Sequence, residues 1–595
     1  MAPELFCAAD VRQTRLDEST VAYSMITRGW TTLSRSEAAV LDCCQSFGTL
    51  EEHAATAVQR LSIEDTDSAV GILRRLSERR LLVSRSDILA ALSINNDSGP
   101  ASDTEGIEAL SIPTRNRPES LYCALSSYMA HLKPASRKLS FWIVDDSTVD
   151  SARSQNVALL NDLSQKRNVD IYYTDRRRRS SFASDLSNVA HIPKEVARFA
   201  LLGDIRMSSV SHGAARNSQL LGLGRRKWIT VDDDTVCNLR THPGARPGLV
   251  IDGEGHPSEY AFFRSHEEAC RYGMPTTRDF VGGHEALLGT SLPTLISRAG
   301  VDNICLKSLR ASIFRRSEDS VPRVAVTGTG FFGDSASDWS GYLLLLNGAN
   351  FNRLVSTPHF SEYMSGRLLS IGVTSVSVSD TAPIIRGLSM GVDGAVHLPP
   401  FLPVDRGEEY LFGTISGFCV PGYLSAIDTL QIEHRPRETR YNSTWWANDY
   451  LRPTAVVAIL VRAYCSSGVA IPRRDRLAGL GTHLIDLGNT KSAHFIETVL
   501  TRCWQTMDGV IRALKQRQVA CSAFPQVVEA IDLTVSALQK QVEQWESLDQ
   551  QSVWIALQDC VQQFGLLLSS WDRIRRAAEH INSRPGRALF HPVRR

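Results

Sequence analysis

Short apolar runs alternate with stretches of helical length through the middle of the chain. The apolar runs predict buried strands at 109–113, 139–144, 169–173 and 228–231. Helices are expected between and after them, at 119–131, 151–166 and 211–223. Alternation of strands and helices at these lengths predicts an α/β fold with a doubly wound, mostly parallel sheet.

The flanking regions have different patterns. Residues 1–92 predict strands, three helices and a closing strand, with a capping box from Ser34 to Glu37 opening the first helix. Residues 93–107 are small, polar and rich in helix breakers, which predicts a linker to an α/β domain at 108–440. Residues 441–595 carry apolar side chains three and four apart, typical of a helical region, which we expect to be an appendage.

Composition excludes several classes of protein. The 595-residue chain has a net charge of +1, which gives no argument for a nucleic acid or an acidic membrane as partner. No apolar run reaches transmembrane length, so a cytoplasmic protein is expected. The 12 cysteines are scattered without a CxxC pair, so neither a zinc site nor a disulfide framework is predicted.

Three carboxylates, Asp232, Asp233 and Asp234, follow the fourth strand. Asp232 and Asp234 would point to one side if strand geometry continued through them. Hard oxygen ligands suit Mg²⁺ or Mn²⁺, and the carboxyl ends of parallel strands are where α/β sheets bind ligands. A solvated turn is the alternative.

Other polar residues also collect at predicted strand ends. They are Pro113, Thr114 and Arg115 after the first strand, Asp145 and Asp146 after the second, and Arg216 and Asn217 in the helix before the fourth. Such clustering is what a nucleotide pocket requires.

A second group of candidates lies further along the chain. Glu408 and Glu409 are adjacent carboxylates close to Arg406 and are followed by an aromatic-rich turn. A glutamate pair at a helix N-terminus would be favoured by the helix dipole. His434 is a lone histidine further along the chain, and such a histidine is usually not a metal ligand.

Two further stretches are expected to be loops. The four arginines 176–179 predict a solvated loop, and the glycine-containing run 327–334 predicts a turn, with Asp334 as a reserve candidate.

Four ordered pieces, 111–119, 144–147, 215–217 and 231–235, together resemble family-2-like glycosyltransferases of the GT-A fold. The resemblance implies that Pro113, Thr114 and Arg115 line the base and ribose, that Asp145 or Asp146 contacts them, and that Arg216 and Asn217 lie near the diphosphate. It equates Asp232, Asp233 and Asp234 with the DxD motif. It implies that Glu409, with Glu408 beside it, is the catalytic base, and that His434 completes the metal site. The glutamate pair replaces the family's Glu-Asp, which makes the base less secure.

The N-terminal unit resembles PqqD-like domains, the recognition elements of enzymes that modify ribosomal peptides. The resemblance lies in the pieces 14–20, 30–33, 37–41, 49–52 and 73–82. It implies that a leader peptide adds a strand beside Trp30, Thr31 and Thr32 and docks on the last helix at Leu73 and Leu76. A winged-helix unit used for oligomerisation or DNA binding is the alternative.

We therefore expect a metal-dependent inverting glycosyltransferase using a nucleotide-sugar, with UDP-sugars foremost, and Mg²⁺ or Mn²⁺. Its expected acceptor is a Ser, Thr or Cys of a precursor peptide, and self-association is left open. Two alternatives remain. One is a transferase for a small molecule or glycan with a structural N-terminal domain, and the other is a non-catalytic peptide-binding scaffold.

Overall fold

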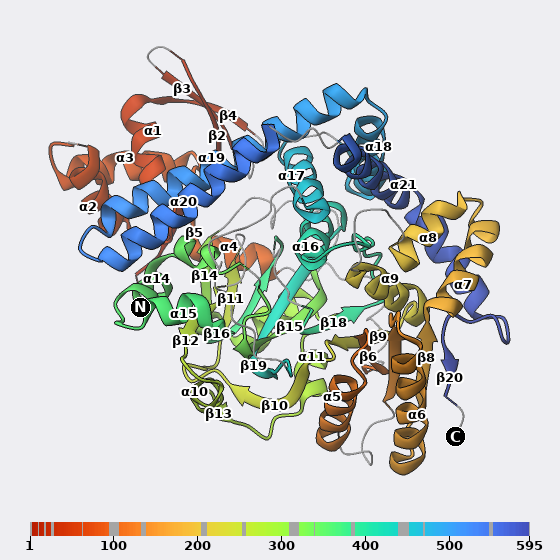
Figure 1. Ribbon diagram of the computed structural model, residues 1–595. Coiled ribbons are helices and arrows are strands. Elements are labelled where there is room, and N and C mark those ends of the chain that lie inside the picture. The colour runs from red at the N-terminus through yellow and green to blue at the C-terminus, as the bar shows by residue number, and fades with distance from the viewer. Residues whose placement is uncertain are drawn as a thin grey trace.

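A computed structural model shows a mixed α/β protein with a large sheet and a helical C-terminal region (Figure 1). It describes residues 3–9, 11–16, 19–24, 29–61, 63–93, 106–132, 139–203, 211–252, 257–308, 321–337, 339–381, 387–437, 452–467, 471–546 and 551–593. Most of the predicted linker, at 94–105, and the predicted boundary near 440 lie outside these residues.

The N-terminal unit has its own hydrophobic core. Its elements are β1 (Phe6–Ala8), β2 (Val11–Arg15), β3 (Ser19–Ser24), β4 (Gly29–Ser34), α1 (Arg35–Cys43), α2 (Leu50–Leu61), α3 (Thr66–Glu78), β5 (Leu82–Ser84) and α4 (Arg85–Ser93). The predicted capping box is present, because Ser34 and Glu37 exchange hydrogen bonds at the start of α1. Strands β2, β3 and β4 form an antiparallel sheet in that order, while the closing strand β5 pairs with β1. Ile88, Leu89 and Leu92 of α4 pack into a core of the α/β part, so this helix attaches the unit.

The predicted alternation of strands and helices is confirmed. Its elements are β6 (Ala109–Thr114), α5 (Pro118–His131), β7 (Ser140–Asp145), α6 (Asp150–Arg167), β8 (Ile171–Asp175), α7 (Arg176–Ala190), α8 (Lys194–Leu202), α9 (His212–Leu223) and β9 (Lys227–Val231). Strands β9, β6, β7 and β8 are parallel neighbours in that order. Their side chains are almost all buried, as expected for strands covered by helices on both faces.

The sheet continues beyond β9 with strands of both directions, in the order β14-β11-β17-β19-β15-β18-β9. The elements are β10 (Thr235–Thr241), β11 (Leu249–Asp252), β12 (Glu259–Phe262), α10 (His266–Tyr272), β13 (Met274–Pro275), α11 (Phe280–Glu285), α12 (Leu292–Ala299), β14 (Ile304–Ser308), β15 (Arg323–Asp334), α14 (Gly348–Val355), α15 (Phe360–Gly366), β16 (Leu368–Gly372), β17 (Val376–Ser379), β18 (Ser389–Asp393), α16 (Glu408–Cys419) and β19 (Tyr423–His434). The run 327–334, expected to be a turn, instead forms most of β15, because its glycines allow close packing against β19 and β16.

The C-terminal region is helical, as predicted, with α17 (Pro453–Ser466), α18 (Arg476–Gly488), α19 (Ser492–Ala520), α20 (Pro525–Glu546) and α21 (Gln551–Asn582). It is not an appendage. Trp571 of α21 is fully buried and donates a hydrogen bond to the Leu398 carbonyl. The end of the chain, β20 (His591–Pro592), pairs with β8 and extends the sheet (Figure 1). No described helix has both the length and the apolar character needed to cross a membrane.

Candidate active site

The parallel strands have an order that creates a ligand site. The chain runs outward from β6 to β7 and β8, and then returns to place β9 on the other side of β6. Loops therefore leave the carboxyl ends of β6 and β9 in opposite directions, which is the switch point where doubly wound sheets bind ligands. Thr114 is the last residue of β6 and Arg117 lies in the loop after it, while Asp232, Asp233 and Asp234 follow β9.

Strand geometry does not continue through the three aspartates. The strand β9 ends at Val231, and the Thr235 amide donates to the Asp232 carbonyl at 3.2 Å, which closes a turn. The strand alternation from which the convergence of Asp232 and Asp234 was expected therefore ends at Val231. The two carboxylates are nevertheless close enough for Asp234 to raise the pKa of Asp232, and Asp234 shares Arg117 with Asp233.

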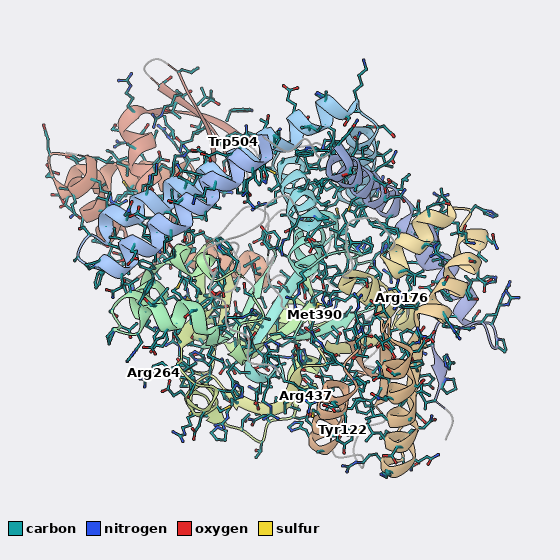
Figure 2. The ribbon with its side chains drawn as sticks, in the orientation of Figure 1. Tyr122, Arg176, Arg264, Met390, Arg437 and Trp504 are labelled. Atoms are coloured by element: carbon teal, nitrogen blue, oxygen red, sulfur yellow. The ribbon has the colours of Figure 1, made fainter. Side chains whose placement is uncertain are left out.

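Asp233 and Asp234 bind residues of the β6 loop. The Thr114 hydroxyl donates to Asp233 Oδ2 at 2.7 Å. Arg117 lies 3.3 Å from one oxygen of each aspartate. Arg117 was not among the predicted site residues, although its position, three after Thr114, could have suggested it. A cavity of about 240 Å³ opens beside these aspartates and is also lined by Arg435 and Arg437, the latter labelled in Figure 2.

Arg216 joins Asp232 to the glutamate pair. Its guanidinium is buried and lies 3.2 Å from Asp232, 3.2 Å from Glu408 and 3.1 Å from Glu409. Helix α9 can place Arg216 there because Gly213 packs against the Leu402–Pro403 backbone, where any Cβ would meet the Leu402 carbonyl oxygen. We call Asp232, Asp233, Asp234, Glu408 and Glu409 the carboxylate cluster.

The two glutamates have different protonation properties. Both lie in the first turn of α16, so the helix-dipole explanation also describes their position. Burial and the neighbouring Glu409 raise the pKa of Glu408 to about 8, with only partial compensation by Arg216. Burial also acts on Glu409, but Arg216 and backbone amides hold its pKa below the ordinary value. Its side chain is 23% exposed against 3% for Glu408, so Glu409 is the ionised and accessible carboxylate.

Two of the aspartates, Asp232 and Asp233, resist ionisation. Burial raises the pKa of Asp232 to about 6, with Asp234 and Glu409 adding to the effect and Arg216 opposing it. Burial and Asp234 raise the pKa of Asp233 to about 7. Crowded carboxylates of this kind are stabilised by an added cation.

His434, at the end of β19, is buried and faces Asp234. Its Nδ1 lies 2.7 Å from the Asp334 carbonyl oxygen, so Nδ1 carries a proton and donates it there. Its Nε2 lies 3.2 Å from Asp234 Oδ1. Asp334 is itself fixed by Arg367 at 3.2 Å, so it positions His434 and is not a ligand in this arrangement. A backbone hydrogen bond to one ring nitrogen is the usual way in which a protein orients a metal-binding histidine.

Three predicted nucleotide contacts serve the fold in this structure. Asp145 is fully buried and accepts hydrogen bonds from Ser147, Asn156 and Tyr173. The Asn217 amide bonds to backbone groups of Ala200 and Phe401.

The third is Asp146, which forms ion pairs with Arg176 at 2.8 Å and with the fully buried Arg179. The arginines 176–179 are therefore not a solvated loop. They form the first turn of α7, where Arg176 is labelled in Figure 2. Pro113 is partly buried, and Arg115 forms a long ion pair with Asp146 at 3.9 Å.

The N-terminal unit presents an edge strand. Among the described strands, β4 pairs only with β3. Trp30 is 71% exposed, and Thr31 and Thr32 lie beside it on the same strand. Arg79, the residue that follows α3, donates to the Thr32 carbonyl at 3.3 Å. Leu73 and Leu76, expected to contact a peptide, are instead fully buried in the unit's core, because the apolar stripe of α3 faces α1 and α2.

No protein-family model and no curated protein gives a match to this chain.

Proposed function

We propose that this protein is a metal-dependent inverting glycosyltransferase that transfers a sugar from a nucleotide-sugar to a peptide. The observation that carries the proposal is the bridge made by Arg216 between Asp232 at the switch point and the glutamate pair on α16. A single side chain, Arg216, thus contacts both the edge of the sheet where a nucleotide diphosphate would bind and the candidate catalytic base Glu409.

The donor set near Asp234 fits a divalent ion. Asp234 and His434 already lie 3.2 Å apart, and the other ring nitrogen of His434 is engaged by a carbonyl. Asp232 would join them by exchanging Arg216 for the ion. When bound, Mg²⁺ or Mn²⁺ would neutralise charge developing on the departing nucleotide diphosphate.

The residues of the chain provide the remaining steps. Arg117 orients Asp233 and Asp234 from the β6 loop. Glu409 accepts the proton of the acceptor hydroxyl or thiol as that atom bonds to the anomeric carbon. The bond from the anomeric carbon to the diphosphate oxygen breaks on the opposite face, so the configuration inverts.

Peptide recruitment is the second part of the proposal. A free edge at β4 can pair with an extended peptide, and the exposed Trp30 offers it an apolar contact. The peptide would displace Arg79 from the Thr32 carbonyl. Binding a leader here would raise the concentration of the attached acceptor at the active site.

The test is calorimetric titration of UDP and GDP into the full chain with and without Mn²⁺. We expect Mn²⁺-dependent binding that weakens at least about 100-fold in Asp234→Ala, by analogy with loss of a metal-site residue. Asp162→Ala is the matched control, since Asp162 is exposed and its ion pair is with Lys166 of its own helix. Failure of the wild type to bind either nucleotide with Mn²⁺ would favour the scaffold alternative.

A second experiment separates peptide from small-molecule acceptors. Trp30→Ala should leave nucleotide binding unchanged and reduce the modification of a leader-bearing peptide. Unchanged peptide modification would instead indicate a structural N-terminal unit.

A further inference from the structure

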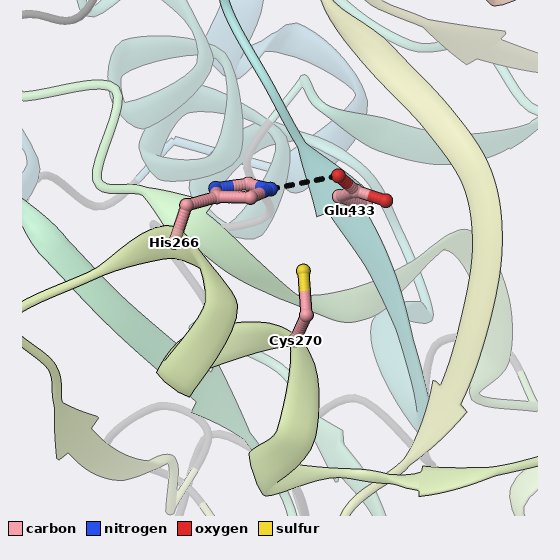
Figure 3. Close-up of side chains that lie close together, drawn as sticks. All are labelled: His266, Cys270 and Glu433. Carbon is pink, nitrogen blue, oxygen red and sulfur yellow. Dashed lines mark hydrogen bonds and ion pairs between the residues drawn. The ribbon is translucent and has the colours of Figure 1, made fainter.

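A separate group of potential metal ligands lies at β19, next to the candidate active site. His266 and Cys270 are four residues apart on α10, so their side chains lie on one face of the helix. Glu433 of β19 faces them, and Figure 3 shows the three side chains pointing toward one another. Their ligand atoms all lie within 4.8 Å of one another, and His266 Nε2 is 2.8 Å from Glu433 Oε1. We call these three residues the α10 cluster.

The separation of these atoms is close to that of a metal site. Zinc holds sulfur at about 2.3 Å and nitrogen or oxygen at about 2.0 Å, so its tetrahedral ligands lie roughly 3.5 Å apart. Small rotations of the His266 and Cys270 side chains would bring the three atoms to that spacing. Cys270 is a free and partly exposed cysteine, so its sulfur is accessible to an ion.

The surroundings hold two of the ligands in place. Asn238 of β10 donates to the second oxygen of Glu433 at 2.9 Å, which fixes the carboxylate from behind. On the other side, Gly333 of β15 has φ +111°, and a Cβ there would lie 3.3 Å from His266 Cε1. The backbone thus leaves room for the imidazole. Arg435 lies 3.4 Å from Glu433 and opposes a cation, but its side chain is 55% exposed and free to turn outward.

We propose that His266, Cys270 and Glu433 bind a single zinc-class divalent ion, leaving one coordination position open. Mixed sulfur, nitrogen and oxygen ligands select Zn²⁺, or Co²⁺ in its place, over Mg²⁺ and Mn²⁺, which prefer oxygen. The site is independent of the proposed glycosyl transfer, because Glu433 and His434 point to opposite faces of β19.

The test uses the full chain stripped of metal by a chelator and then titrated with Co²⁺, followed by competition with Zn²⁺. A thiolate bound to Co²⁺ gives a charge-transfer absorption band that oxygen ligands do not give. We expect the band in the wild type at one ion per chain, and its displacement by Zn²⁺. Cys270→Ser should abolish it, and His266→Gln should weaken binding at least about 100-fold, more than loss of an outer partner.

Matched variants make the result decisive. Cys305→Ser removes an exposed thiol outside the α10 cluster, and His359→Gln removes a histidine that, like His266, is 35% exposed and paired with a glutamate. Both should keep the band, as should Asp234→Ala. The proposal is overturned if the folded wild type shows no band at micromolar Co²⁺. It is also overturned if the band survives in Cys270→Ser, or disappears in Asp234→Ala while surviving in His266→Gln.

Discussion

The carboxylate cluster and the α10 cluster meet the same strand, β19, through adjacent residues. His434 faces Asp234, whereas Glu433 faces His266 on the other side. The first cluster is rich in oxygen and is bridged by the buried Arg216, while the second combines a histidine and a cysteine of a short helix with a glutamate of β19. In the two proposals one strand serves two sites of different chemistry, and the metal preference of each site would be set by the ligands on the elements that face the strand.

The largest difference between the two clusters is expected in catalysis, which should depend on the carboxylate cluster and not on the α10 cluster. Glu409→Gln keeps the size of the side chain but removes the proton acceptor, so turnover should fall by about 10²–10⁴, the usual contribution of a general base. Nucleotide binding and the Co²⁺ band should be retained. The measurement is kcat for sugar transfer or, before the acceptor is known, for hydrolysis of the donor.

Glu408→Gln is the matched variant. Since Glu408 is buried with its pKa raised to about 8, it is already protonated at neutral pH, and the amide should cost much less activity. An equal loss in both variants, or a greater one in Glu408→Gln, would move the role of base to Glu408.

Substitutions beside the two clusters should also differ in their effect on the free energy of unfolding. The strand ends beside the carboxylate cluster depend on buried ion pairs, and Asp146→Asn would leave Arg179 buried without its charge partner. We expect a loss of about 3–5 kcal/mol in the free energy of unfolding. His266→Gln, on a partly exposed helix, should change it by about 0.5 kcal/mol or less. Urea denaturation measures both.

The stability difference between the wild type and Asp146→Asn should become smaller as the pH falls. Although burial alone would raise it, Arg179, Ser211 and Arg176 hold the pKa of Asp146 below 3.8 in the folded protein. The unfolded state therefore binds the proton first, and this contribution to stability is complete above pH 3.8 and is lost as pH falls further. The gap between wild type and Asp146→Asn should narrow in that acid range. A gap independent of pH would mean that packing, not charge, causes the loss.

Gly333 offers a test of whether the two clusters are separate, because it lies against His434, which faces Asp234 of the carboxylate cluster, and against His266 of the α10 cluster. A Cβ at this position would lie 2.2 Å from the His434 carbonyl oxygen as well as close to His266, and its φ is positive. Gly333→Ala should cost about 2 kcal/mol or more. It should weaken Mn²⁺-dependent nucleotide binding and Co²⁺ binding together.

Gly366→Ala, where a Cβ meets nothing within 4 Å, is the control for the loss of a glycine. If Gly333→Ala impairs one site and spares the other, the two clusters do not share the backbone of β15.

The two clusters also differ in how far the sequence reveals them. Asp232 to Asp234 are contiguous and follow a recognisable buried strand, so a pattern of strand ends suffices to predict their location. The turn in which they lie was not predictable, because it depends on the hydrogen bond from the Thr235 amide to the Asp232 carbonyl. Glu409 and His434 were found through resemblance, whereas Arg216 as a bridge needed the packing of Gly213.

The α10 cluster could not be predicted in this way. A single His-x-x-x-Cys on a seven-residue helix is common, and its third ligand lies 163 positions beyond Cys270 in sequence, beside a histidine with another role. Because the sequence lacks a CxxC pair, no zinc site was predicted from it, but that rule concerns only ligands that are close in sequence. Contacts between residues distant in sequence also explain why Arg179 was wrongly expected to be in solvent. Its guanidinium is enclosed by β7 and α8, where it donates to the carbonyls of Asp145 and Leu201.

The smallest expected effect concerns Asn238, which contacts the α10 cluster without being a ligand. Asn238→Ala removes the hydrogen bond that fixes Glu433, and loss of such an outer partner lowers metal affinity by about 10–100-fold. The Co²⁺ band should remain at saturation, with a weaker dissociation constant, while Mn²⁺-dependent nucleotide binding should not change. Asn352→Ala, at an exposed position of α14, is the matched control. Unchanged Co²⁺ affinity in Asn238→Ala would mean that Glu433 needs no support from β10, and that α10 alone determines the geometry of the site.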